Sequence, residues 1–139
     1  MPFDGTTPAK PQRAQLTAAE SALVLDVAEV FFRDGAMWAR GAYCTLDGRR
    51  CLLEAVRLAR RQIGGRFDRA PDYLARAIRL RRGGDLYLGT EGTVIAFNDA
   101  RGRKWRQIAA VIRKAKALAE AEAQARPPSR KCRDIALLH

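Results

Sequence analysis

Thr93-Val-Ile-Ala-Phe-Asn-Asp-Ala-Arg-Gly-Arg-Lys-Trp105, continued by Arg106 to Ala119, is the stretch of sequence on which the expected fold depends. Thr93–Phe97 is a β-branched and aromatic run, which predicts a buried strand. The Asn98-Asp99 pair that follows favours a turn or a helix cap. At about 100° per residue, the next residues form an amphipathic helix. Its apolar face holds Trp105, Ile108, Val111, Ile112, Ala115, Leu118 and Ala119, and its opposite face holds Arg103, Arg106, Arg113 and Lys114.

Three further helices are predicted before this stretch. They begin at the capping-box pattern Thr17–Glu20, at Cys51 and at Ala70-Pro71, and they end near Gly35, Gly64-Gly65 and Gly83-Gly84. Residues 37–46 alternate as an exposed edge strand does, and residues 86–88, a loop at 89–92 and Thr93–Phe97 predict a β-hairpin. The expected fold class is therefore α+β, with four helices packed on a small antiparallel β-sheet in a single domain.

The domain is expected to span residues 16–125, between a flexible N-terminal arm (1–15) and a basic C-terminal tail (126–139). A chain of 139 residues is enough for one domain with its own core. The aromatic and apolar residues on the buried faces should share that core. They are Phe31, Trp38, Phe97, Trp105, Ile108 and Ile112.

The formal net charge of +11 and the pI of about 10.6 predict acidic partners such as nucleic acid, an anionic membrane surface or an acidic protein. A GC-rich genome would account for part of the arginine excess. The charge is also segregated, because residues 49–83 and 100–139 each sum to +8, whereas 16–48 and 84–99 each sum to −3. Segregation of this kind indicates a positively charged surface.

The cellular setting is expected to be the cytoplasm of a bacterium, with the gene of bacterial or phage origin. No apolar run approaches the roughly 20 residues of a membrane span. Residues 1–15 lack the apolar core of a signal peptide. An odd number of cysteines, three, fits a reducing compartment.

Catalytic and metal sites find little support in the sequence. The single histidine is His139, so a Ser-His-Asp arrangement is not expected. Cys44 and Cys51 are interpreted as reduced, buried hydrophobes. Cys44/Cys51 and Cys132/His139 are spaced too widely for a usual structural zinc site, so we expect neither a metal nor a cofactor. Asp47, Glu54 and Asp99 remain as carboxylates for a hydrolase, although Asn98 and Asp99 also fit a cap of the last helix.

The basic helix faces are the strongest functional signal. Guanidinium groups bind phosphates and carboxylates through a planar fork. The residues expected to face outward are Arg57, Arg61, Arg76, Arg79, Arg82, Arg103, Arg106, Arg113 and Lys114. Few aromatic residues lie among them, and Tyr73 and Trp105 are assigned to the core, so contact with a phosphate backbone fits better than base readout.

The most favoured function is therefore a non-catalytic binding module for an acidic partner, first a nucleic-acid backbone. The first alternative is an accessory or inhibitor protein that binds an acidic protein surface of a larger phage or mobile-element complex. The carboxylate-based hydrolase is the second alternative. Scattered, merely solvated arginines would explain the same pattern without any partner.

Several motifs in this order resemble a family of small uncharacterised bacterial and phage proteins, a domain of unknown function. They are Gly35–Gly41 with its tryptophan, Cys51-Leu52-Leu53-Glu54-Ala55, and the aromatic-Asn-Asp turn at Phe97–Asp99. Phe97 stands where such families carry tryptophan. The resemblance covers about residues 16–119 and implies no known activity.

Overall fold

The computed structural model of this chain describes residues 12–82, without the side chain of Arg82, and residues 88–125. This part is all-helical. Its elements are α1 (Arg13–Phe31), a short 3-10 helix η1 (Arg33–Gly35), α2 (Leu52–Ile63), α3 (Ala70–Arg82), α4 (Thr90–Asp99) and α5 (Trp105–Gln124). The predicted arm overlaps the start of α1, while residues 1–11 and the predicted tail lie outside the described residues.

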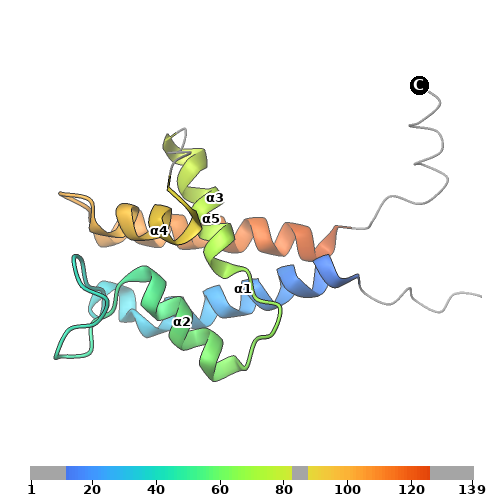
Figure 1. Cartoon of the computed structure of the whole chain (residues 1–139), viewed down its shortest axis with the longest axis horizontal. Coiled ribbons are helices and arrows are strands. Elements are labelled where there is room, and N and C mark those ends of the chain that lie inside the picture. Colours follow the sequence, from blue (N-terminus) through green and yellow to red (C-terminus); the bar gives the residue numbers. More distant parts are fainter. Residues whose placement is uncertain (1–11, 83–87, 126–139) are drawn as a thin grey trace, which may run out of the picture.

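The two longest helices, α1 and α5, lie side by side and run antiparallel, and α2, α3 and α4 pack around them (Figure 1). Lys116 of α5 reaches across to α1, where its ammonium lies 2.8 Å from Asp26 Oδ1 and 3.6 Å from Glu29 Oε1. The hydrogen bond to Asp26 raises the pKa of Lys116. The predicted shared core is confirmed, since Phe97, Ile108 and Ile112 are buried in one cluster and Phe31, Trp38 and Trp105 pack against it.

The starts and ends of α2 follow the sequence signals. The Cys51 thiol caps its first turn by accepting a hydrogen bond from the Glu54 amide at 3.4 Å. Gly64 ends the helix with a left-handed φ of 73°. Cys51 is buried, which raises the pKa of its thiol. Cys44 is exposed, so its predicted burial is wrong.

The predicted α+β fold class is wrong, because the described residues contain no β-strand. Thr93–Phe97 lies inside helix α4, which buries Thr93, Val94, Phe97 and Asn98 against the other helices. These positions follow a helical spacing, which a run of five residues is too short to distinguish from a strand. The supposed turn at 89–92 contains the cap of α4 at Gly89 and its first residues. Residues 86 and 87 of the predicted partner strand lie outside the described residues.

The predicted edge strand at 37–46 is also wrong, since this part of the described chain forms a loop with two isolated bridges, Trp38–Arg50 and Cys44–Arg50. Asn98 holds this loop. Its Oδ1 accepts hydrogen bonds from Trp38 Nε1 (2.8 Å) and the Leu52 amide (3.0 Å), and its Nδ2 donates to the Ala39 carbonyl (3.0 Å). Asn98 therefore binds the start of α2 and does not cap α5 as the sequence suggested.

Candidate functional site

A strip of unpaired cations runs from the α4–α5 turn along the solvent face of α5. We call it the α5 basic strip, and it consists of Arg101, Lys104, Arg106, Arg113 and Lys114. All five residues are exposed, and none forms an ion pair with any described residue. In the helical part, the three basic side chains fall on the arc opposite the buried residues, because α5 buries Ile108, Ala109, Val111, Ile112, Ala115 and Ala119.

Two arginines from other parts of the chain extend this strip. Arg40 donates a hydrogen bond from Nη1 to the Ala100 carbonyl at 3.3 Å, which places it at the α4–α5 turn. Arg33 lines the same hollow of about 430 Å³ as Arg113 and Trp105. The backbone of Arg33 has a left-handed φ of 45°. The next residue, Asp34, accepts a hydrogen bond from Trp105 Nε1 at 3.2 Å, which fixes this turn against α5.

Three of the predicted binding residues on α2 and α3 bind carboxylates of the protein itself. Arg57 lies 3.1 Å from Glu91 and 3.7 Å from Glu54, and Arg61 lies 3.5 Å from Glu54. Arg76 donates to Glu122 near the end of α5 at 2.6 Å through Nη1. Glu122 is about 24 Å along the helix axis from Arg106. Arg57, Arg61 and Arg76 are therefore partly neutralised, and the partner of Arg76 lies about two helical turns beyond Lys114, the last residue of the strip.

Arg79 and Arg103 turn inward rather than outward. Arg79 donates through Nη2 to the Leu88 carbonyl and Thr93 Oγ1, both at 3.5 Å. Arg103 is only 7% exposed, so its predicted outward orientation is wrong. Its Nε donates to the Phe97 carbonyl at 2.7 Å, and its guanidinium lies 3.7 Å from the centroid of the Phe97 ring. Arg82 was also predicted to face outward, but its side chain lies outside the described part of the chain.

Of the predicted binding residues, the structure thus brings Arg106, Arg113 and Lys114 together. Sequence reasoning missed Arg33, Arg40, Arg101 and Lys104 as members of the same surface. The run from Arg101 to Lys104 was a local signal, because it places three basic residues directly before a helix. No comparable signal linked Arg33 or Arg40 to α5, since both reach it only through the tertiary fold.

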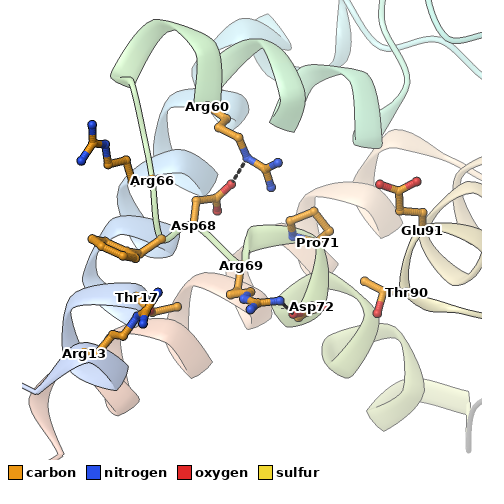
Figure 2. A pocket seen from close by; sticks show the side chains of 11 residues that line it. Arg13, Thr17, Arg60, Arg66, Asp68, Arg69, Pro71, Asp72, Thr90 and Glu91 are labelled. Carbon is orange, nitrogen blue, oxygen red and sulfur yellow. Dashed lines mark hydrogen bonds and ion pairs between the residues drawn. The ribbon is translucent and has the colours of Figure 1, made fainter.

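A second arginine-rich feature lies at the other end of the molecule, around the loop between α2 and α3. Here a hollow of about 420 Å³ is lined by four arginines and three carboxylates (Figure 2). We call it the arginine hollow. Its charged residues are Arg13, Arg60, Arg66, Arg69, Asp68, Asp72 and Glu91.

The carboxylates considered for hydrolysis have separate structural partners. Asp47 accepts hydrogen bonds from Thr45 and Arg49, which lower its pKa. Glu54 pairs with arginines around α2, and Asp99 accepts a hydrogen bond from the Gly41 amide at 2.8 Å. Within residues 12–82 and 88–125, no group of three or more His, Cys, Asp or Glu residues could hold a metal ion.

The fold and surface of the described residues define a small all-helical domain with a basic strip on its last helix. The chain belongs to the Family of unknown function (DUF6197), which it matches over residues 17–118. The resemblance drawn from the motifs is thereby confirmed, with nearly the same bounds. No curated protein and no solved structure matches the chain. Among the described helices, none is both long and apolar enough to cross a membrane.

Proposed function

We propose that this protein is a non-catalytic module that binds the phosphate backbone of a nucleic acid through the α5 basic strip. The observation that carries the proposal is an asymmetry of charge along one element. Between Asp99 and Glu120 the chain has no acidic residue, and its exposed basic side chains there have no carboxylate partner among the described residues. Elsewhere, arginines such as Arg57 and Arg76 are neutralised within the fold.

The spacing of the strip fits a chain of phosphates. Arg106 and Arg113 are separated by two helical turns, a rise of about 10 Å. In duplex DNA the phosphates of one strand rise by roughly 3.4 Å per nucleotide along the helix axis, so this distance equals about three such steps where α5 lies along that axis. Arg101 and Lys104 continue the strip before the first residue of α5. The positive end of the helix dipole lies there and also favours anions.

Backbone contact accounts better for this surface than sequence readout does. On the solvent-facing arc of α5, the half-buried Ala110 lies between the basic side chains and the exposed Ala117 follows Lys114, so short side chains accompany the cations. Such cations bind phosphates without regard to base sequence. We therefore expect affinity for random sequences and a strong dependence on salt.

An acidic protein surface is the alternative partner, and one observation favours it. The hollow beside Trp105 is lined by Arg33 and Arg113, by the carboxylates Glu29 and Asp34, and by Val30, which is 69% exposed. A surface that combines charges of both signs with exposed apolar side chains suits a protein interface with a few anchoring contacts. Such an interface would depend on Val30 and Trp105 and would tolerate salt better than phosphate contacts do.

Charge reversal tests the proposal. Arg106→Glu and Arg113→Glu, singly and together, should weaken binding of fluorescent random duplex DNA, single-stranded DNA or RNA in an anisotropy titration. Arg81→Glu is the matched control for the single variants, because Arg81 is exposed on α3, has no ion pair among the described residues, and its reversal changes the net charge as much as either single strip variant does. Circular dichroism should show that all variants stay folded.

The proposal predicts a loss of binding with the strip variants and little change with Arg81→Glu. Equal loss in all variants would mean that only net charge matters, and the strip would not be the site. Absence of binding to all three nucleic acids at low salt would refute the nucleic-acid function and leave the acidic protein partner.

A further inference from the structure

We propose that the arginine hollow is a second, separate site that binds a nucleoside monophosphate. It lies beside the start of α1, where Gln15 Nε2 donates to the Ala125 carbonyl at 2.5 Å, so it is near the end of α5. Ala125 is about 28 Å along the helix axis from Arg106. The hollow is therefore remote from the first turn of α5 and does not depend on the proposed strip function.

The wall of the hollow is held in place before any ligand arrives. The loop between α2 and α3 is tied to α1 by two hydrogen bonds, from the Phe67 amide to Glu20 Oε1 at 3.2 Å and from the Arg69 amide to Ser21 Oγ at 2.7 Å. The Ser21 hydroxyl in turn donates to the Thr17 carbonyl at 2.6 Å. A preformed wall lowers the entropy lost on binding.

A buried carboxylate orients one of the arginines. The side chain of Asp68 is fully buried, and its Oδ2 accepts a hydrogen bond from Arg60 Nε at 2.5 Å while its Oδ1 accepts one from the Ala70 amide at 2.6 Å. Figure 2 shows the Arg60 guanidinium above the hollow, with the bond to Asp68 at one side only. The two terminal amino groups of Arg60 have no carboxylate partner among the described residues and are suited to phosphate oxygens.

The remaining charges leave the phosphate end positive. Arg66 is exposed and has no ion pair with a described residue, and Arg69 has only a long contact of 3.9 Å to Asp72. Of the carboxylates, Asp68 is committed to Arg60, and Glu91 is bound by Arg57 at 3.1 Å. Figure 2 shows the Arg60 and Arg66 guanidinium groups on opposite sides of Asp68, so a phosphate dianion would meet one of them first and would compete with Asp72 for Arg69.

An aromatic ring beside these arginines supplies a place for a base. Phe67 lines the hollow and is 38% exposed, and the Arg13 guanidinium lies 5.0 Å from its ring centroid. Nucleobases stack on aromatic rings and on guanidinium planes. The volume of about 420 Å³ lies within the range of small-ligand pockets. Phosphate-binding arginines next to a stacking surface therefore point to a nucleotide rather than to a bare anion.

Isothermal titration calorimetry on the full chain tests this site with AMP, adenosine and inorganic phosphate as probes. AMP should bind more tightly than either of its parts. Arg66→Gln should weaken AMP binding roughly tenfold, since it removes one charge-assisted contact. Phe67→Leu should weaken binding of AMP but not of phosphate. A single strand with a 5′-phosphate, added as a competitor, distinguishes a strand end from a free nucleotide as the source.

Two controls keep the outcome decisive. Arg81→Gln removes an exposed charge outside the hollow and should leave the affinity for AMP unchanged, as should Arg106→Glu in the strip. The site is refuted if AMP gives no binding, if Arg66→Gln and Arg81→Gln behave alike, or if Arg106→Glu abolishes AMP binding. The last result would place the nucleotide on the strip. If the protein binds AMP but does not bind DNA, only the proposed function of the strip is refuted.

Discussion

Replacing Asn98 by alanine should destabilise the protein more than any single change at an exposed position. Asn98 is fully buried and bridges the end of α4, the loop after η1 and the start of α2. Asn98→Ala leaves the Leu52 amide, the Ala39 carbonyl and the Trp38 indole without their partner. The first two bonds are buried, whereas Trp38 is partly exposed and can reach water.

Each buried polar group that loses its partner costs about 1–3 kcal/mol. Two such groups and a partly exposed indole give an expected loss of about 3–5 kcal/mol in the free energy of unfolding. Domains are typically stable by only about 5–15 kcal/mol. Urea titration followed by tryptophan fluorescence and far-UV circular dichroism would measure the loss by linear extrapolation.

Asp99→Asn is the matched control for this measurement. Asp99 is exposed, and the replacement keeps an oxygen that can accept from the Gly41 amide. It should change stability by less than about 1 kcal/mol. The reasoning about Asn98 would be refuted if Asn98→Ala fell within about 1 kcal/mol of the parent protein.

Two other predictions concern the backbone at η1 and a buried phenol. Gly35→Ala should lower the free energy of unfolding by more than about 2 kcal/mol, because φ is +97° and the added Cβ would lie 2.5 Å from Trp105 Cγ. Gly41→Ala is the control, with φ of +81° and no atom within 4 Å of the added Cβ. It should cost about 1 kcal/mol in the same urea assay. Equal costs would contradict the close approach to Trp105. Burial, followed by the hydrogen bond to Glu122, raises the pKa of Tyr73 from 10.0 to about 12. The stability linked to this shift is present below about pH 10 and is lost as the pH rises toward 12. An ultraviolet titration should therefore show one tyrosine that ionises at a higher pH than an ordinary tyrosine, and Tyr73→Phe should remove this step. A titration unchanged by Tyr73→Phe would contradict the shift.

The helices that have clear start and stop signals could be predicted from the sequence. Gly64 ends α2 where a left-handed residue was expected, and α3 begins at Ala70, next to Pro71. Helix α4 could not be assigned, because Thr93–Phe97 satisfies a strand propensity locally while its burial against neighbouring helices decides the structure. The apparent hairpin depended on that one short segment, and the α+β class depended on it and on the alternation in residues 37–46, which form a loop with isolated bridges.

The candidate surface was predictable only where helical periodicity governs exposure. Arg106 and Arg113 lie outward on α5 because the apolar residues of the same helix define its buried face. Arg103 stands in the preceding turn, where no period applies, and it folds back over Phe97. The pairing of Arg76 with Glu122 joins residues 46 positions apart, which a single sequence does not reveal.

The salt dependence of DNA binding tests the central claim most directly. For a random duplex, each phosphate contact should contribute roughly −0.9 to the slope of log K against log salt concentration. Contacts from all five residues of the α5 basic strip would give a slope of about −4.5, and Arg106→Gln should lower the magnitude of this slope by about 0.9. A measurable affinity with a slope unchanged by Arg106→Gln, or no binding at low salt, would contradict the account.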